Sequence, residues 1–423
     1  MKHIGIICPP LPGHLNPMAV LGRALVRRRY RVTVFQVAAL EQRVRSEGLE
    51  FSSVGTPSPD LTAAIDQMGK LSGIASLRFA VQAAARLAGI ICREGPAVLS
   101  QQAVDLVLVD QNEPAGGTVA ERLKIPFVSV APSLPLNREP CIPPPFVGWS
   151  YSARWPGRLR NRFGYALSDR LISPINKTLN EYRRTWGLAE LRSPDDSFSR
   201  LAQLCQMPRE FDFPRCNLSP VVNYVGPFID SGPGLQTPPF PFERIDGRPL
   251  IYASFGTLQP GALVYFERIA EACSELDVQV VITTGNFAGE MPRFAGNTIA
   301  VRYAPQLELL SRAALTITHA GLNTTMQSLY FGVPMVAIPM THDQPAIAAR
   351  IAWTGCGLVV PPRGASVPRL REAIKSALSG PNYRAAARTL QDAIRRAGGV
   401  EGAVDIVEQF LRNKQTSDAS GNR

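Results

Sequence analysis

The chain of 423 residues has no apolar run long enough to cross a bilayer, which argues against a membrane-spanning protein. Its first eight residues enter a strand-like segment without the apolar core and small-residue cleavage site of a secretion signal. We therefore expect a cytoplasmic protein. A hydrophobic content of 45% is typical of a globular chain with well-filled cores.

Motifs for disulfides, metals and dinucleotides are also missing. The seven cysteines are scattered, odd in number and without a C-x-x-C pair, so we expect reduced thiols rather than disulfides or a zinc site. No Asp-x-Asp pair is present to hold a divalent metal, and no G-x-G-x-x-G turn follows the first strand-like segment. The sequence therefore predicts no bound metal, no NAD domain and no other cofactor.

Acidic residues are outnumbered, because 45 lysines and arginines stand against 34 aspartates and glutamates, a formal net charge of +11. Such a balance favours anionic partners. The basic residues are dispersed, and no helix-turn-helix, zinc-finger or RNP pattern is present, so we expect no nucleic acid partner. An anionic nucleotide ligand or an anionic membrane surface fits better, and a general role in solubility explains the charge as well.

Strand-like and helical patterns alternate from the start of the chain, which predicts an α/β fold with a parallel sheet covered on both faces. The expected strands are Ile4–Cys8, Arg31–Phe35, Leu106–Asp110 and Phe127–Val130. The expected helices between them are Leu15–Arg28, Ile74–Arg93 and Gly116–Leu123.

Residues 226–249 interrupt this alternation with six prolines, as a linker would. The length also favours two domains. We predict a first lobe over 1–228, a linker over 229–248 and a second lobe over 249–400. The second lobe should contain strands at Leu250–Ser254, Gln279–Thr283 and Ile299–Arg302 and a helix at Ala262–Ser274. Ligands of open α/β sheets bind at the carboxyl ends of the strands, here in a cleft between the lobes.

The end of the chain is expected to form an amphipathic helix over residues 401–412. The polar residues 413–423 are expected to be a frayed tail.

The segment 315–344 carries the most specific pattern of the chain. A strand-like run, Leu315–Thr318, stops at His319, a helical pattern covers Thr324–Phe331, and Val333–Pro339 predicts the next strand. The start of that helix would offer backbone N–H groups and a helix dipole to an anion such as a diphosphate. Asp343 and Gln344 follow the next strand at the same edge of the sheet, where they can bind hydroxyl groups. An ordinary β-α-β unit with a buried histidine is the plain alternative.

His14 and Asp110 are a second candidate pair. His14 lies between the first expected strand and helix, in a loop at the carboxyl edge of the sheet, and Asp110 ends a strand at that edge. A histidine with a pKa near neutrality can take a proton from a hydroxyl group, and a carboxylate can fix its tautomer. Taken singly, His14 is explained as well by packing at a helix start, and Asp110 by a cap or salt bridge.

An ordered set of residues in the segment 315–344 resembles a known signature. It is similar to the donor-binding signature of nucleotide-sugar glycosyltransferases of the plant secondary-product and macrolide type, family 1, with the GT-B fold. It comprises His319, Gly321, Asn323, Thr324, Gly332, Pro334, Pro339, Asp343 and Gln344. The pattern Pro-x-x-Gly-His-x-Asn-Pro around His14 is similar to that family's catalytic-histidine loop, and Asp110 matches its partner position. The resemblance implies two Rossmann-like lobes and a terminal helix that crosses back to the first lobe.

The resemblance also assigns roles in donor binding. His319 and Thr324 would donate to the phosphates, Asn323 would support the turn or the phosphates, and Asp343 and Gln344 would hold the sugar. Ser254, Gly256 and Thr257 follow the first strand of the second lobe and would contact the diphosphate. The uracil site would be formed by Tyr303, Ala304 and Gln306, with Tyr303 in place of the usual tryptophan. Gln327 stands where plant members carry a ribose-binding glutamate.

A narrower resemblance, to the bacterial zeaxanthin glucosyltransferases, spans nearly the whole chain. It includes residues 110–116, 126–130, 134–140, 317–319, 343–345 and 405–409. It implies UDP-glucose as co-substrate and a hydroxylated carotenoid as acceptor, in an inverting, metal-independent transfer.

The acceptor side carries weaker signals. Leu134, Pro144, Phe146 and Trp149 are candidates to wall an acceptor cleft, although the proline-rich stretch could equally be a rigid loop. Residues 151–172 interleave five arginines with aromatic and apolar residues, which suits peripheral contact with an anionic membrane. A solvated helix whose apolar side packs on the first lobe is the alternative.

Three alternative functions remain open at this stage. The acceptor could be a phenol, a flavonoid or a polyketide aglycone. The chain could be a nucleotide-sugar epimerase of the same fold, which would not need His14 and Asp110 at an acceptor-facing edge. A non-catalytic activator of a glycosyltransferase is a third class, but it would be expected to lack both the base and the donor signature.

Overall fold

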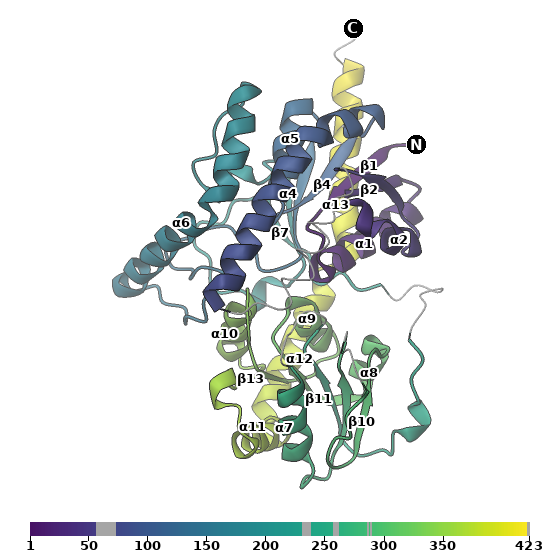
Figure 1. Cartoon of the computed structure of the whole chain (residues 1–423), viewed down its shortest axis with the longest axis vertical. Helices are drawn as coiled ribbons and strands as arrows, with labels where there is room; N and C mark the ends of the chain where they lie inside the picture. The colour runs from purple at the N-terminus through teal and green to yellow at the C-terminus, as the bar shows by residue number, and fades with distance from the viewer. Residues whose placement is uncertain (56–72, 231–237, 257–261, 286, 288–289, 421–423) are drawn as a thin grey trace.

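The computed structural model describes residues 1–55, 73–230, 238–256, 262–285, 287 and 290–420, and for 73–76 and 413–420 the backbone alone. Two α/β lobes lie one above the other in Figure 1. Each lobe is built on its own parallel sheet, as the alternation of elements predicts.

The N-terminal lobe contains a seven-stranded sheet in the order β3-β2-β1-β4-β5-β6-β7, parallel at every pairing. Its strands are β1 His3–Ile7, β2 Arg31–Gln36, β3 Glu50–Ser53, β4 Leu106–Asp110, β5 Phe127–Ala131, β6 Gln203–Cys205 and β7 Val222–Tyr224. Its helices are α1 Pro12–Arg27, α2 Glu41–Ser46, α4 Gly73–Gln101, α5 Ala115–Leu123 and α6 Trp155–Thr185, with short 3-10 turns at 38–40, 194–197 and 209–211. Strands β1, β4 and β5 are buried along their whole length, which explains why their sequences are apolar except for His3, Asp110 and Ser129.

The C-terminal lobe contains a six-stranded parallel sheet in the order β10-β9-β8-β11-β12-β13. Its strands are β8 Leu250–Ser254, β9 Gln279–Thr283, β10 Thr298–Val301, β11 Ala313–Thr318, β12 Met335–Ala337 and β13 Gly357–Val359. Its helices are α7 Leu263–Cys273, α8 Gln306–Arg312, α9 Leu322–Tyr330, α10 Gln344–Thr354, α11 Val367–Ser379 and α12 Pro381–Arg396, with short 3-10 turns at 242–244 and 362–364.

Two helices near the predicted site begin earlier than predicted. Helix α1 begins at Pro12 rather than at Leu15, because a proline is favoured in the first turn, where its missing N–H has no partner to lose. His14 therefore lies in the first turn of a helix and not in a loop. Helix α9 begins at Leu322, two residues before the predicted Thr324, so only residues 319–321 form the turn between β11 and α9.

The last helix, α13 Gly399–Ser420, returns to the N-terminal lobe, as the resemblance implied (Figure 1). Val404 and Val407 are fully buried in the core beneath β1 and α1. Arg28 at the end of α1 forms ion pairs with Glu401 and Asp405 of α13. The helix is longer than the predicted 401–412, because its backbone stays helical through most of the segment expected to be a frayed tail.

The two lobes also share a buried contact surface. Leu134 and Phe211 of the N-terminal lobe pack in one apolar cluster with Ala320 and Met326 of the C-terminal lobe. Beside it, buried Asp212 accepts hydrogen bonds from Arg215 at 2.6 Å and from Arg350 of α10 at 2.8 Å. These contacts fix how the carboxyl ends of the two sheets approach each other. Over the described part of the chain, no helix is both long and apolar enough for a membrane span.

Candidate active site

The pair His14–Asp110 forms as the sequence predicted. Asp110 ends β4 and is fully buried, while His14 projects from the first turn of α1 after the neighbouring strand β1. The Nδ1 atom of His14 lies 2.7 Å from Oδ2 of Asp110, and the other carboxylate oxygen accepts the backbone N–H of Asn112 at 2.8 Å. This arrangement leaves Nε2 as the free nitrogen of a ring whose side chain is 19% exposed.

The electrostatic surroundings of His14 include a carboxylate from the opposite lobe. Burial lowers the pKa of His14, but the adjacent carboxylate of Asp110 and the more distant one of Asp343 outweigh it, so the net pKa is raised. Burial in turn raises the pKa of Asp343, and His14 and His342 oppose that shift. The candidate base and the candidate sugar-binding acid therefore act on each other across the junction of the lobes.

His319 lies at the end of β11, as predicted, in a pocket shaped by two glycines. A Cβ atom at Gly321 would lie 2.6 Å from Nε2 of His319, and one at Gly256 would lie 3.2 Å from Cε1. Burial lowers the pKa of His319 to about 4, with the backbone of Ser254 opposing and His342 adding to the shift. The imidazole is therefore neutral at pH 7 and can offer a hydrogen bond but no charge. Between His319 and Gly321, Ala320 has a left-handed backbone conformation (φ 65°), which is strained and often found at functional sites.

Helix α9 begins directly after this turn, with Gly321 as its N-cap residue and Thr324 buried in its first turn. The side chain of Gln306 hydrogen-bonds both Thr324, at 3.5 Å, and Gln327. Tyr252 of β8 donates to Oε1 of Gln306 at 2.9 Å. The predicted base-binding Gln306 and ribose-binding Gln327 therefore belong to one hydrogen-bonded network. A glutamate at position 327 could accept the same N–H from Gln306, but it would add a charge.

Asn323 makes two contacts that the sequence did not predict, and its role in supporting the turn or the phosphates stays a prediction. Its Oδ1 accepts a hydrogen bond from Gln206 at 2.7 Å, and its Nδ2 donates to the backbone oxygen of Gly13 at 3.0 Å. Both partners belong to the N-terminal lobe, and Gly13 precedes the candidate base. Asn323 therefore connects the lobes instead of serving only its own turn.

Asp343 and Gln344 stand at the start of α10, after β12, at the edge predicted for them. The amide oxygen of Gln344 accepts the backbone N–H groups of Met340 and Thr341, both at 2.9 Å. The oxygen is therefore engaged in holding the loop before α10. The amide nitrogen donates only one long hydrogen bond, to Oγ1 of Thr341 at 3.5 Å, so its second N–H is left for a ligand.

The remaining predicted donor residues surround this centre. Ser254 ends β8 and is buried, and Gly256 has a positive φ of 69°. Tyr303 follows β10 with 46% of its surface exposed, as a stacking surface requires, and Ala304 follows it. Thr257 lies outside the described residues.

The four predicted acceptor residues do not form one wall. Leu134 is 1% exposed within the shared cluster of the two lobes, so it presents no surface to a ligand here. Pro144 and Trp149 pack against Gly164 of α6, where a Cβ would lie 2.9 Å and 2.8 Å from them. Phe146 is 39% exposed. The positions of these four side chains depend on how the lobes and α6 pack together, and the local sequence pattern does not predict that packing.

Two polar residues near the centre were not singled out from the sequence. Gln206 reaches Asn323 from the irregular segment after β6, where no spacing marks it. Glu113 is buried beside Asp110, and burial together with that carboxylate raises its pKa to about 8. Glu113 stands directly before a proline and a buried helix, and this position is the one sequence feature that could have indicated a buried acid.

Among the described residues, no group of three or more His, Cys, Asp or Glu side chains could hold a metal ion. Metal independence nevertheless stays a prediction.

Two facing parallel-sheet lobes with a returning terminal helix define the GT-B class of glycosyltransferases. Solved structures agree with this fold. A calicheamicin glycosyltransferase superposes with a TM-score of 0.74 over 98% of this chain and 99% of its own, at 21% identity. The kitacinnamycin glycotransferase gives 0.75 over 96% and 98%, at 22% identity. The glycosyltransferase VinC, solved in complex with dTDP, gives 0.69 over 97% and 100%, at 20% identity.

Sequence comparisons narrow the class. The C-terminal domain family of erythromycin biosynthesis protein CIII-like proteins matches residues 267–402. Zeaxanthin glucosyltransferase of Pantoea ananas is 34% identical over 97% of this chain and 96% of its own. The corresponding enzyme of Pseudescherichia vulneris is 32% identical over 98% and 100%. The chain therefore belongs to the family 1 glycosyltransferases, with relatives among the bacterial zeaxanthin glucosyltransferases.

Proposed function

We propose that this glycosyltransferase transfers a hexose, best matched by glucose, from a UDP-sugar to a hydroxyl group of a lipophilic acceptor, with inversion and without a metal. The observation that carries the proposal is the 2.7 Å contact of His14 with Asp110, at the junction with the donor-binding lobe. Zeaxanthin or a related hydroxylated carotenoid is the best candidate acceptor, because two relatives above 30% identity carry the name zeaxanthin glucosyltransferase.

The acceptor hydroxyl is a weak nucleophile and needs a base. Since Nδ1 of His14 is bonded to Asp110, Nε2 takes the hydroxyl proton as the oxygen attacks the anomeric carbon. The carboxylate of Asp110 then stabilises the imidazolium that forms. The bond between the anomeric carbon and the phosphate oxygen breaks as the new bond forms, so a single displacement inverts the configuration.

The leaving nucleoside diphosphate takes the electron pair of that bond and needs hydrogen-bond donors. His319 supplies a neutral donor, Thr324 supplies a hydroxyl, and the first turn of α9 supplies backbone N–H groups and its dipole. Asp343 and the amide nitrogen of Gln344 hold the sugar hydroxyls.

The test is a mass-spectrometric assay of the purified protein with zeaxanthin in detergent and with a panel of soluble phenols and aglycones. Each acceptor is offered with UDP-glucose and, because Gln327 carries no charge, with dTDP-glucose as well. His14→Ala should abolish transfer, whereas His3→Asn should not, because His3 lies at the opposite, amino end of β1.

Each outcome decides a separate part of the proposal. A hexose added to zeaxanthin from UDP-glucose, and lost in His14→Ala, supports donor, acceptor and base together. Transfer only to soluble phenols keeps the mechanism and overturns the carotenoid acceptor. Use of dTDP-glucose alone overturns the donor, and unchanged transfer by His14→Ala overturns the base.

A further inference from the structure

Helix α6 has its apolar side facing outward. Its first half buries small and polar residues against the N-terminal lobe, namely Gly157, Asn161, Gly164 and Ser168. Its exposed side carries large apolar residues at a spacing of four, namely Trp155, Leu159, Phe163 and Leu167. The hypothesis that the apolar side of this helix packs on the lobe is therefore wrong.

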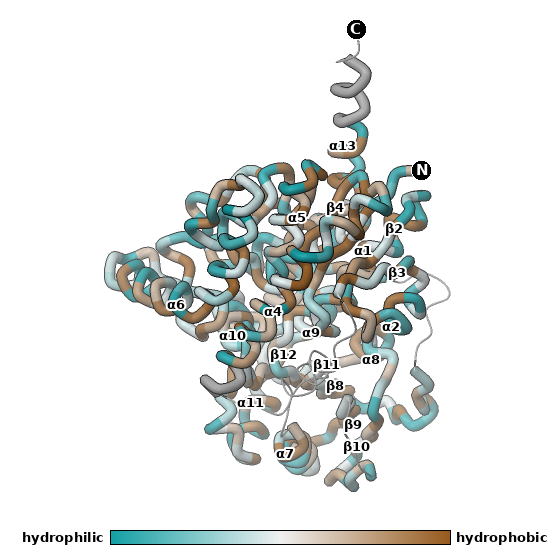
Figure 2. Tube along the Cα trace, turned by 45° about the horizontal axis from the view of Figure 1, so that its top comes forward, coloured by the Kyte–Doolittle hydropathy of each residue, from teal (hydrophilic) through white to brown (hydrophobic). Residues whose placement is uncertain are grey.

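The exposed fractions of this apolar stripe are high, at 75% for Trp155, 59% for Leu159, 70% for Phe163 and 62% for Leu167. A spacing of four residues places the side chains on one face over about three turns. The helix lies at the edge of the molecule, where Figures 1 and 2 both show it projecting from the body. A contiguous exposed apolar face of this kind marks an interaction surface.

The charge around the stripe identifies its partner. Residues 154–170 contain five arginines and one acidic residue, Asp169. Asp169 is paired with Arg138, at 2.5 Å and 2.9 Å. Within the described part of the chain, Arg158 and Arg162 have no carboxylate within ion-pair distance. Their charges are therefore available to an external anion.

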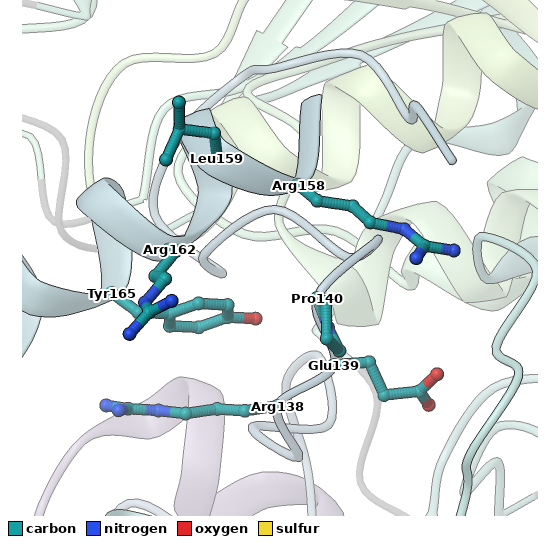
Figure 3. Close-up of a pocket in the computed structure, with 7 residues that line it drawn as sticks. All are labelled: Arg138, Glu139, Pro140, Arg158, Leu159, Arg162 and Tyr165. Atoms are coloured by element: carbon teal, nitrogen blue, oxygen red, sulfur yellow. The ribbon is translucent and has the colours of Figure 1, made fainter. Parts of the chain in front are cut away.

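A pocket joins these arginines to the stripe. Figure 3 shows its lining, which comprises Arg138, Glu139, Pro140, Arg158, Leu159, Arg162 and Tyr165. The one carboxylate among them, Glu139, accepts the backbone N–H groups of Cys216 and Asn217. Its volume of about 480 Å³ accommodates a phosphate headgroup. Because Leu159 belongs to both, the cationic pocket opens directly onto the apolar stripe.

We infer that this face of α6 docks on the surface of an anionic phospholipid bilayer. The apolar stripe enters the acyl boundary, while Arg158 and Arg162 bind lipid phosphates, as in amphipathic helices that lie in the plane of a membrane. A protein partner would explain the apolar stripe but not the pocket in which Arg158 and Arg162 stand without an ion-pair partner among the described residues. Docking as such does not depend on which acceptor the enzyme uses.

The location of the face also suits acceptor delivery, a role that rests on the proposed function. Trp149 packs on α6 at Gly164, and one residue earlier a Cβ at Gly148 would lie 3.3 Å from the backbone of Pro345, beside Asp343 and Gln344. The segment 144–149 therefore spans from the inner side of α6, opposite the docking face, to the sugar-binding edge. A lipophilic alcohol leaving the bilayer would meet this segment first.

The test is flotation of the full-length protein with vesicles of phosphatidylcholine alone or with phosphatidylglycerol added. Wild-type protein should float with the anionic vesicles, and 0.5 M salt should weaken the association. Arg158→Glu/Arg162→Glu and Phe163→Ser/Leu167→Ser should each reduce partitioning by more than about tenfold. Arg363→Glu/Arg388→Glu, a charge-matched change on the exposed surface of the other lobe, and Leu201→Ser should leave partitioning unchanged.

A spectroscopic readout adds a second measurement. Trp155 should shift its fluorescence to shorter wavelength on insertion, and Trp155→Phe should remove that shift. Absence of flotation, or equal flotation of the docking and control variants, overturns the inference. Transfer to soluble acceptors by the docking variants should equal wild type, so a failure of docking and a failure of the proposed transferase activity remain distinguishable.

Discussion

Asn323 of the donor-binding lobe donates a hydrogen bond to the backbone carbonyl of Gly13, 3.0 Å away and one residue before the candidate base. The same side chain accepts a hydrogen bond from Gln206. A residue of the donor signature therefore helps to fix the position of His14, which pairs with Asp110 within its own lobe, relative to the sugar site of the other lobe.

Replacing this residue tests that coupling. Asn323→Ala removes both interlobe hydrogen bonds, and the loss of about 1–2 kcal/mol should lower kcat/KM by roughly tenfold. Gln206→Ala removes one of the two, so it should have a smaller effect. The double variant should be no worse than Asn323→Ala in steady-state assays. Full additivity of the two changes would contradict the shared network.

The pH dependence of activity tests the His14–Asp110 pair. The base must be neutral, so kcat/KM should rise as pH passes upward through the pKa of His14, which is raised above its ordinary value. Asp110→Asn removes the carboxylate that raises this pKa, so the midpoint should move to lower pH. The plateau should fall by about 10²–10⁴-fold, because the imidazolium loses its stabilising charge.

The measurement is a pH profile of kcat/KM from pH 5.5 to 9 for both proteins, with folding checked at each pH. An unshifted midpoint in Asp110→Asn would mean that another group controls the acid limb.

A glycine substitution tests the room around His319. Gly321 has an ordinary φ of −68°, so its backbone tolerates alanine. The added Cβ, however, would lie 2.6 Å from Nε2 of His319, and the ring must move. We expect Gly321→Ala to reduce kcat/KM by about 10- to 100-fold, because a displacement near 1 Å is costly at a reacting centre. Gly89→Ala in α4 is the matched control, since its Cβ would meet only Thr178 at 3.6 Å. Equal activity of the two variants would show that His319 does not need its observed position.

The sequence was informative wherever function follows from strand ends. Asp110 ends a buried strand, and His14, His319 and Asp343 each follow one; parallel strands bring their carboxyl ends to one edge of each sheet. Spacing along the chain was therefore enough to place them.

Features that depend on how separate elements pack could not be predicted in this way. The periodicity of the α6 sequence shows that the helix has two faces, but not which of them packs on the lobe. The face with small residues, including Gly157 and Gly164, is the one that packs on the lobe. Leu134 looked like an acceptor contact, yet the meeting of the lobes buries it. Gln206 lies in irregular backbone, where neither period nor motif exists.

Glu113 provides a test that depends on stability rather than activity. Its pKa is raised to about 8, chiefly by burial and secondly by Asp110, so in the native protein it stays protonated up to that pH. In the unfolded chain it ionises near its ordinary pKa of about 4.3. Between these two values the native state binds more protons than the unfolded state, so this group makes stability fall as pH rises from about 4 to 8.

Glu113→Gln removes the titration of this side chain and keeps its shape. It should stabilise the protein at pH 8 by about 3–4 kcal/mol relative to its effect at pH 5. Thermal unfolding of wild type and variant at both pH values checks this.

The control must be a residue without buried hydrogen bonds. Gln111→Glu is unsuitable, because Gln111 is itself buried and hydrogen-bonded to Gln203. Glu94→Gln on the outer face of α4, where Arg93 is its partner, is the suitable one and should show no such difference. A Tm gain for Glu113→Gln that is the same at pH 5 and pH 8 would mean that the side chain is not protonated in the native protein.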